Sequence, residues 1–339
     1  MKMEKNYFLN KKILITGASG SIGSALVLYL LRSGCKVIRA LSNDENGLFE
    51  LGQKISGKKI QKNFGAEMKL QKVRYIYGDV ADQERCISAS QGIDIIIHAA
   101  AIKHVPFCEY NPFEATKTNV VGTENMVRAS LINNVSKFLL VSTDKVVDPT
   151  SCLGASKLLA ERLVVNANNV KGDKKTIFAC ARFGNVIGTR GSILPFFQKQ
   201  INDNQNLTVT DKKMTRFFMT IEDAVESIVD SIFLMKGNEI FIPKKLKLFK
   251  IIDLAESLLK RFEKKHLKID EIGKRPGEKL FESLISNSEL ERVKIKENYF
   301  VIQNEINNNS YKKKIGKIIN NYKVMKKEEI FKFLKKNLS

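Results

Sequence analysis

The 339-residue chain has no apolar run long enough to cross a membrane. Its most apolar stretches are SALVLYLL and IDIIIHAAA, which have under half of the roughly 20 residues that a membrane helix requires. The segment MKMEKNYFLNKK has neither the apolar core nor the cleavage site of a signal peptide. We therefore predict a cytoplasmic protein without an integral membrane segment.

Cysteine and histidine are scarce and scattered. The five cysteines include no CxxC pair, and the three histidines form neither a metal-ligand cluster nor a Ser-His-Asp arrangement. A disulfide framework and a zinc site are therefore not predicted, and we expect no metal.

Basic residues outnumber acidic ones, 57 to 36, and give a formal net charge of +21. Such a charge would suit a nucleic acid or an acidic membrane. The lysines are spread among many asparagines, which indicates a compositional bias, so we predict no nucleic-acid partner. The densest basic segment is YKKKIGKIINNYKVMKKEEIFKFLKKNLS. Ile330, Phe331 and Leu334 predict a final helix docked on the body with a solvated lysine face, and docking on a membrane surface is the alternative.

Short β-branched runs alternate with amphipathic runs of helix length, a pattern typical of βαβ units and a parallel sheet. The predicted strands cover residues 12–16, 36–41, 73–77, 94–98, 137–142, 176–183, 207–210 and 239–242. The predicted helices cover residues 21–32, 45–55, 83–90, 112–133, 153–168, 193–201, 221–235 and 250–262. The weakly patterned segment 56–72 is predicted to be an extended loop.

These elements predict an α/β fold, a Rossmann-like doubly wound parallel sheet with a smaller C-terminal substrate-binding lobe. The Rossmann domain is assigned to residues 1–184, with some later segments returning to it. The lobe is assigned mainly to residues 185–285, and a basic C-terminal extension to residues 286–339.

Three glycines follow the first predicted strand, in ILITGASGSIGSAL. The spacing Gly17-x-x-Gly20-x-x-Gly23 lets the turn tighten, the backbone approach a pyrophosphate and the helix pack on the strand. The helix N-terminus adds free N–H groups and the positive end of a dipole. We predict a dinucleotide site here, and a merely tight structural turn is the alternative. The cofactor-binding residues predicted on this loop are Gly17, Ser19, Gly20, Ser21, Ile22 and Gly23.

The end of the second strand distinguishes NADP from NAD, because an acidic residue there hydrogen-bonds the ribose of NAD and repels a 2′-phosphate. The strand ends in VIRALSNDEN, with Ser42 and Asn43 in the critical places and Asp44 slightly later. NADP is therefore favoured, although the usual phosphate-clamping Arg is absent too, and NAD stays open as the alternative. Other residues predicted to face the dinucleotide are Asp79, Val80, Ala99, Ala100 and Ala101.

Six motifs occur in the order and approximate spacing of one enzyme family. They read HAAAIKHVPFCEYNPFEATKTNVVGTEN, STDKVVDPT, GASKLLAE, RFGNVIGTRGSILPFF, MTRFFMT and RPGEKLFE. With them the chain resembles the nucleotide-sugar 4,6-dehydratases of the extended short-chain dehydrogenase/reductase superfamily. It is most similar to the inverting UDP-N-acetylglucosamine 4,6-dehydratases of the polysaccharide biosynthesis protein family. The tail after Ile285 lies outside the resemblance.

The resemblance implies an internal redox cycle in bacterial-type surface glycan or nonulosonic acid biosynthesis. Hydride leaves C4 of the sugar for NADP⁺, the 4-keto group acidifies the proton on C5, water is lost across C5 and C6, and hydride returns to C6. The implied substrate is a UDP-linked N-acetylhexosamine, with a GDP-linked one as the alternative and with inversion at C5 left open. The resemblance also implies a homo-oligomer, formed through helices such as 112–133 and 153–168.

The segment Ser142-Thr143-Asp144-Lys145 ends the fifth predicted strand, at the edge where parallel sheets place ligands. By resemblance, Asp144 protonates the leaving hydroxyl and Lys145 is the base at C5. A lysine acts as a base near neutral pH only if burial or a neighbouring cation lowers its pKa. Lys157 or the nicotinamide ring would supply that charge.

Three further residues are expected beside the cofactor by resemblance. Lys157 hydrogen-bonds the nicotinamide ribose, and Ser142 and Asn119 lie close to the same ring. A buried Asn119 of purely structural use is the alternative.

Leu153 departs from the close members of the family, which have Tyr at this position. A leucine neither donates nor accepts a proton. Larger membrane-anchored 4,6-dehydratases and some soluble relatives also lack this Tyr and keep the Thr/Ser-Asp-Lys segment, so its loss is compatible with activity. Thr143 is then the best-placed hydroxyl to polarise the 4-keto oxygen, with Asp144 able to take the proton directly or through water.

Downstream motifs supply arginines for the nucleotide diphosphate, because a guanidinium holds phosphate oxygens in a bidentate manner. Surface ion pairs are the alternative for these arginines. The predicted substrate-binding residues are Lys103, Thr143, Asn185, Arg190, Arg216, Arg275 and Glu278.

Two other functions fit the same resemblance less well. A 4-epimerase would return hydride to C4 and needs no base at C5, so Asp144 and Lys145 argue against it. A catalytically silent NADP-binding scaffold would account for the missing Tyr at Leu153.

Overall fold

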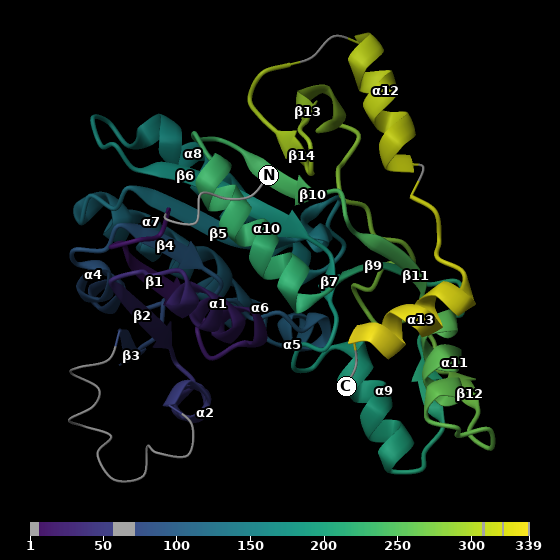
Figure 1. Ribbon diagram of the computed structural model, residues 1–339. Helices are drawn as coiled ribbons and strands as arrows, with labels where there is room; N and C mark the ends of the chain where they lie inside the picture. The colour runs from purple at the N-terminus through teal and green to yellow at the C-terminus, as the bar shows by residue number, and fades with distance from the viewer. Residues whose placement is uncertain (1–6, 57–71, 307–308, 321, 338–339) are drawn as a thin grey trace.

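The computed structural model describes residues 7–56, 72–306, 309–320 and 322–337. The loop predicted over residues 56–72 therefore lies almost wholly outside the described residues. Among those described, nine strands form one sheet in the order β13-β14-β10-β6-β5-β4-β1-β2-β3 (Figure 1). Their bounds are β1 Lys12–Thr16, β2 Val37–Ser42, β3 Val73–Tyr77, β4 Ile95–His98, β5 Lys137–Thr143, β6 Ile177–Phe183, β10 Ile240–Pro243, β13 Val293–Ile295 and β14 Tyr299–Ile302.

The order β3-β2-β1-β4-β5-β6 is that of a dinucleotide-binding fold, and each neighbouring pair within it is parallel. The reversal of strand order lies between β1 and β4, so a crevice opens at the carboxyl ends of these two strands. The central strands are apolar because both faces of the sheet are covered: Ile13, Leu14 and Ile15 are completely buried. The predicted Rossmann-like α/β fold is confirmed.

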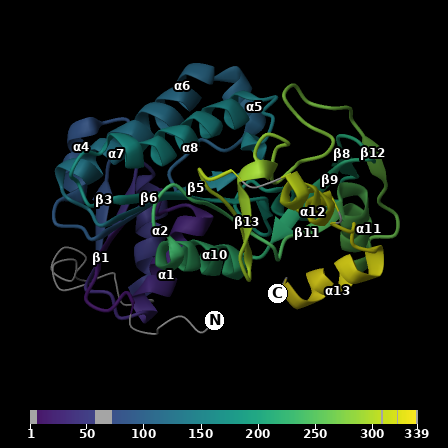
Figure 2. The same cartoon turned by 90° about the horizontal axis from the view of Figure 1, so that it is seen from above.

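Helices cover both faces of this sheet (Figure 2). One face carries α1 and α10, and the other carries α4, α7 and α8. The bounds are α1 Ser21–Arg32, α2 Glu45–Ser56, α4 Gln83–Ser90, α7 Gly122–Ile132, α8 Cys152–Val170 and α10 Ile221–Leu234.

The helix predicted over residues 112–133 is interrupted. It consists of α6 (Pro112–Thr116), a π-helical segment η2 (Lys117–Val121) and α7. The side chain of Asn119 turns inward from the π segment to bond the main chain of Ile102, which a regular helical pattern does not reveal. Just before this helix, α5 (Val105–Tyr110) is a short element that the sequence analysis missed.

A smaller lobe lies beyond the carboxyl ends of the strands. Its core is formed by a three-stranded sheet of β7, β9 and β11, by the pair β8 and β12, and by two amphipathic helices. The bounds are β7 Asn185–Val186, β8 Leu207–Val209, α9 Ile193–Asn202, β9 Thr215–Met219, β11 Lys247–Lys250, α11 Ile251–Arg261 and β12 Ile269–Glu271.

After residue 221 the chain returns to the main sheet. Helix α10 packs against α1, β10 pairs with β6, and the antiparallel strands β14 and β13 extend the sheet beyond β10. A short turn of 3-10 helix, η4 (Leu290–Arg292), precedes β13, and α12 (Asn309–Asn320) packs on η4. The sheet is therefore mixed at this edge.

The C-terminal helix docks on the lobe, as the sequence predicted. Helix α13 (Lys327–Asn337) packs on α11 and buries Ile330, Phe333 and Leu334. Phe331, which the sequence analysis assigned to the apolar side, is instead half-buried beneath the Lys260 ammonium, 5.1 Å from its ring centre. Among the described helices, none is both long and apolar enough to cross a membrane.

Candidate functional site

The glycine loop between β1 and α1 leaves no room for side chains. Gly17 has a φ of +63°, and a Cβ on it would lie 2.8 Å from the Cα of Ala100. A Cβ on Gly23 would lie 2.2 Å from the Gly17 carbonyl oxygen. The main chain of β4 and the loop therefore meet at the crevice where the strand order reverses. The amide of Ala100 fixes this approach by donating to Thr16 Oγ1 at 3.1 Å.

The predicted adenosine-side residues lie together at the tip of β2. Ser19 and Ser42 share a hydrogen bond of 2.7 Å between their hydroxyls. Asn43 Nδ2 donates to Asp79 Oδ2 at 2.9 Å, and Asp79 Oδ1 accepts from the amide of Ala81. Val80 packs against Gly122, so the π-helix and α7 seal this end of the crevice.

Arg190 contacts the glycine loop between β1 and α1, although its predicted role was in substrate binding. Its main-chain N–H donates to Ser21 Oγ at 2.9 Å, and its guanidinium donates to the carbonyl of Ser19. The same guanidinium lies 3.7 Å from the Asp44 carboxylate. Lys103 Nζ donates to the Arg190 carbonyl, so the loop between β7 and α9 crosses the crevice. We call this loop, residues 187–192, the strap.

Close packing holds this strap. Gly191 has a φ of +68°, and a Cβ on it would lie 2.3 Å from the ring of His104. Burial, followed by the charge of Arg190, lowers the pKa of Lys103. Burial also lowers the pKa of His104, with the neighbouring Lys103 charge adding to the effect.

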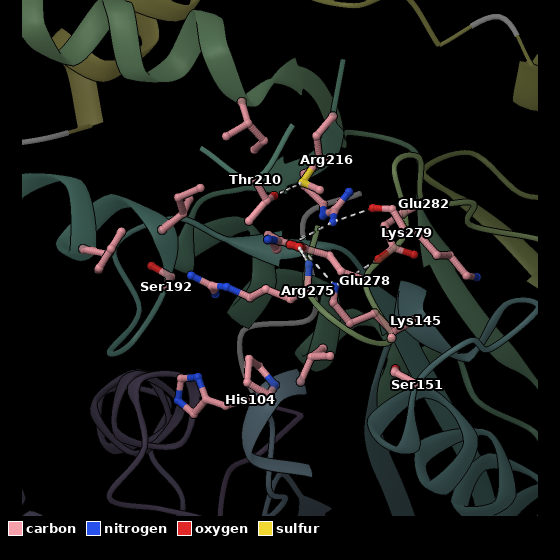
Figure 3. Close-up of a pocket in the computed structure, with 18 of the residues that line it drawn as sticks. His104, Lys145, Ser151, Ser192, Thr210, Arg216, Arg275, Glu278, Lys279 and Glu282 are labelled. Carbon is pink, nitrogen blue, oxygen red and sulfur yellow. Dashed lines mark hydrogen bonds and ion pairs between the residues drawn. The ribbon is translucent and has the colours of Figure 1, made fainter. Parts of the chain in front are cut away.

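A cavity of about 550 Å³ lies between the ends of the main-sheet strands and the lobe (Figure 3). Its wall brings together the predicted base Lys145 and five residues predicted to bind substrate: Lys103, Asn185, Arg216, Arg275 and Glu278. Thr143 and Arg190, which were also predicted to bind substrate, do not belong to this wall. Residues that the sequence analysis did not select also line it: His104, Thr210, Lys279 and Glu282. Basic groups predominate among its charged lining residues, which suits an anionic ligand.

The Ser142–Lys145 segment sits at the end of β5 and opens a short 3-10 helix, η3 (Asp144–Val146). Asp144 Oδ1 accepts from Thr143 Oγ1 at 3.0 Å and from Lys145 Nζ at 2.9 Å. Lys145 Nζ also donates to Asn185 Oδ1 at 3.4 Å. Asp144 has no exposed surface, whereas Lys145 reaches the cavity wall.

Lys157 is buried behind this segment. Its Nζ donates to the carbonyl of Val141 at 2.8 Å. Burial lowers the pKa of Lys157 to about 8, although the charge of Glu161 opposes this shift. His98 lies close by, and burial together with the Lys157 charge lowers the pKa of His98 to about 3. The imidazole is therefore neutral, and it joins Thr16 to Thr123.

The polar atoms of Asn119 bond protein groups. Its Oδ1 accepts from the Ile102 amide at 2.9 Å, and its Nδ2 donates to the Ile102 carbonyl and to Ser156 Oγ. Asn119 is completely buried. It therefore ties the segment after β4 to helix α8 beside Lys157.

Leu153, in the place of the family's Tyr, belongs to a small apolar cluster. Its side chain is buried with Cys108 and Ala115 beneath α5 and α6. It does not belong to the cavity wall described above. The position has become part of the apolar packing between helices.

Arg216 acts as an anchor within the wall. Its guanidinium donates to the carbonyls of Thr215, Lys279 and Leu280, and it lies 3.6 Å from Glu278. The side chain is almost completely buried. It therefore holds the RPGEK segment against β9, and Arg275 on that segment is exposed.

Residues 13–304 match the family model described as polysaccharide biosynthesis protein. The chain belongs to this family. A protein named UDP-N-acetylglucosamine 4,6-dehydratase (inverting), from Campylobacter jejuni, is 41% identical, covering 88% of this chain and 84% of the relative. The resemblance inferred from the six motifs is confirmed.

Two other similar proteins extend over nearly the whole chain. A protein named uncharacterized membrane protein MJ1061, from Methanocaldococcus jannaschii, is 42% identical, covering 95% of this chain and 96% of the relative. The solved structure of Pen from Bacillus thuringiensis has a TM-score of 0.88 and 35% identity, covering 98% of this chain and 99% of that one. The polysaccharide biosynthesis family match thus includes the lobe as well as the main sheet.

Proposed function

We propose that this protein is an NADP-dependent 4,6-dehydratase of a UDP-linked N-acetylhexosamine that serves surface glycan biosynthesis. One observation carries the proposal. Lys145 reaches the cavity wall from the end of β5, and the buried Asp144 carboxylate orients its ammonium at 2.9 Å. A lysine at this position supports the assignment of a base beside a sugar bound in the cavity. The similarity to the Campylobacter jejuni dehydratase supports the same reaction.

The residues of the crevice fit a dinucleotide. A Cβ at Gly17 would collide with the main chain of Ala100, and one at Gly23 with the Gly17 carbonyl, so only glycine lets the loop fold this tightly at the N-terminus of α1. Such an N-terminus offers N–H groups to a pyrophosphate. A dinucleotide held by this loop would supply the hydride acceptor and donor that the internal redox cycle needs. The Arg190 guanidinium beside Asp44 supports NADP, because it is a basic group near the tip of β2, where a 2′-phosphate would lie.

The reaction asks three tasks of the chain's own side chains. Thr143, hydrogen-bonded to Asp144, polarises the 4-oxygen, and Asp144 receives the proton of that hydroxyl. Lys145 removes the proton from C5. A carboxylic acid protonates the departing 6-hydroxyl, and by resemblance that acid is Asp144.

The charge of the cavity supports a nucleotide diphosphate as the activating group. Lys103, Arg275 and Lys279 line the wall, and Glu278 is held there by Arg216. Guanidinium and ammonium groups bind phosphate oxygens strongly in a partly enclosed site. A GDP-linked sugar would use the same phosphate contacts, so direct comparison of the two nucleotides decides between them.

Incubation of the protein with UDP-N-acetylglucosamine in deuterated water tests the proposal. The wild type should form a 4-keto-6-deoxy product that carries deuterium at C5. The variant Lys145→Ala should not form this product. Lys199→Ala, an exposed change on α9 outside the cavity, is the matched control and should behave as the wild type. Full turnover by Lys145→Ala would contradict the assignment of Lys145 as the base. Return of hydride to C4, giving the C4 epimer without loss of water, would show an epimerase.

A further inference from the structure

A second carboxyl group, that of Glu282, lies beside Lys145 in the cavity wall. Glu282 belongs to the segment after β12, and its side chain is only 4% exposed although it lines the wall. Its Oε1 lies 3.8 Å from Lys145 Nζ. Figure 3 shows Lys145 and Glu282 on the same side of the cavity.

Two buried arginines hold the segment that carries Glu282. Arg216 donates to the carbonyls of Lys279 and Leu280, just before Glu282. Arg182, completely buried between Glu161 and Glu289, donates to the carbonyl of Leu284 just after it. A position fixed on both sides by charge-assisted bonds is preorganised for a task that needs precise placement.

One oxygen of each carboxyl group lacks a partner among the described residues. These are Glu282 Oε2 and Asp144 Oδ2, both buried. Buried polar atoms are normally hydrogen-bonded, so the unpartnered oxygen of Glu282, a residue of the cavity wall, indicates a group that a ligand completes. The other oxygen of each carboxyl group, Asp144 Oδ1 or Glu282 Oε1, lies 2.9 or 3.8 Å from Lys145 Nζ, the base of the proposed reaction.

Burial favours the neutral form of the Glu282 carboxyl. Burial raises the pKa of the Glu282 carboxyl, and the nearby Asp144 carboxylate raises it further, while Lys145, Arg216 and Lys279 oppose the shift. A second anionic carboxylate beside Lys145 would also stabilise the charged ammonium and weaken the lysine as a base. The arrangement that lets Lys145 work therefore has a proton on Glu282.

We propose that Glu282 is the catalytic acid that protonates the departing 6-hydroxyl of the sugar. The inference rests on the proposed dehydratase function and reassigns one of its proton transfers. Asp144 has no exposed surface, and its Oδ1 is occupied by Thr143 and Lys145. Glu282 reaches the cavity, so it is the carboxyl that a 6-hydroxyl can approach.

The protons and electrons balance over one turnover. Asp144, through Thr143, accepts the proton of the 4-hydroxyl as hydride leaves C4. Lys145 takes the C5 proton, that electron pair forms the C5=C6 bond, and the C6–O bond breaks as Glu282 protonates the oxygen, which leaves as water. Hydride then returns to C6 and Lys145 returns a proton to C5. The proton held on Asp144 passes to Glu282 and restores the starting state.

A substrate with a better leaving group isolates the acid. Fluoride departs with little need of protonation, so UDP-6-deoxy-6-fluoro-N-acetylglucosamine should lose fluoride even where the acid is missing. Glu282→Gln should reduce water loss from UDP-N-acetylglucosamine by about 100-fold or more, the usual contribution of general acid catalysis. It should release fluoride from the fluoro substrate within about 10-fold of the wild-type rate. Glu271→Gln, an exposed change on β12 outside the cavity, is the control for both substrates.

The variant Asp144→Asn distinguishes the roles of the two carboxyl groups. If Asp144 accepts the proton of the 4-hydroxyl, Asp144→Asn should slow elimination by a similar factor with both substrates. The inference is overturned if Glu282→Gln is equally slow on both substrates, or if the fluoro substrate rescues Asp144→Asn instead. Bound cofactor and circular dichroism of each variant separate lost chemistry from lost folding. A wild type that eliminates neither water nor fluoride would refute the proposed function itself.

Discussion

The guanidinium of Arg190 lies 3.7 Å from the carboxylate of Asp44, although one residue follows β7 and the other follows β2. The tip of β2 itself carries Ser42 and Asn43 and no basic group. The strap supplies a cation there from a distant part of the chain. A 2′-phosphate placed beside Ser19 and Asn43 would meet this cation and would compete with Asp44 for it.

Arg190→Gln should therefore change the choice of cofactor. We expect the affinity for NADPH to fall by about 10-fold. This loss is smaller than for a buried arginine, because the guanidinium is half exposed and solvent screens its charge. The affinity for NADH should change by less than about 3-fold, since it carries no 2′-phosphate. Fluorescence titration of both reduced nucleotides measures this directly, without any need for turnover.

Arg128→Gln, an exposed change that removes the ion pair with Glu124 on α7, is the matched control for Arg190→Gln. Added salt should weaken NADPH binding by the wild type more than by Arg190→Gln. Equal losses of NADPH and NADH would show that Arg190 only closes the strap over a part that both cofactors share.

Local patterns predicted the first half of the fold because strands, helices and the glycine loop are written in adjacent residues. The predicted strand 73–77 and helices 21–32 and 83–90 match β3, α1 and α4. The positions of Arg190 and Glu282 could not be predicted in this way. Each is placed by a return of the chain over a long distance, and isolated arginines and glutamates carry no local signal of their target.

The same limit applies to Leu153. The resemblance to the family implied that a hydroxyl is missing at this position. The structure shows that the Leu153 side chain takes part in apolar packing. The side chain fills an apolar contact with Cys108 and Ala115, and α5, which supplies Cys108, was not predicted. A short helix of six residues with a Pro in its first turn offers too little periodicity to be recognised.

The homo-oligomer implied by the resemblance has a candidate surface in the structure. Phe107, Tyr110 and Phe113 on α5 and α6 are 55%, 87% and 77% exposed. Three neighbouring aromatic side chains in water are typical of an interaction surface. Phe113→Asp should shift the protein toward the monomer. Because the substitution lies on the surface, the melting temperature should change by no more than a few degrees.

Light scattering coupled to size exclusion at several concentrations checks the Phe113→Asp prediction. Phe262→Asp is the matched control, because Phe262 is also exposed but lies after α11 in the lobe. A wild type that is monomeric throughout would contradict the oligomer, and an unchanged assembly in Phe113→Asp would exclude this surface.

Lys157 makes the stability of the protein depend on pH in a predictable direction. Burial lowers its pKa from 10.5 to about 8, so between these values the unfolded chain binds a proton that the folded chain has released. The free energy of unfolding should therefore rise with pH through this window. Below the folded pKa, the buried ammonium carries its full penalty, on the order of 3 kcal/mol.

Lys157→Met should remove that penalty. The variant should be more stable than the wild type below the folded pKa by about 2 kcal/mol, after subtraction of about 1 kcal/mol for the lost bond to Val141. Its advantage should shrink as pH rises toward the ordinary lysine value. Urea unfolding at several pH values measures the difference, and Lys199→Met is the exposed control. A constant difference across the range would contradict a buried ammonium as its cause.

Because Lys157 is expected to bond the nicotinamide ribose, the stabilised variant Lys157→Met should also bind NADPH more weakly. This outcome is expected where a residue is kept for function at a cost in stability.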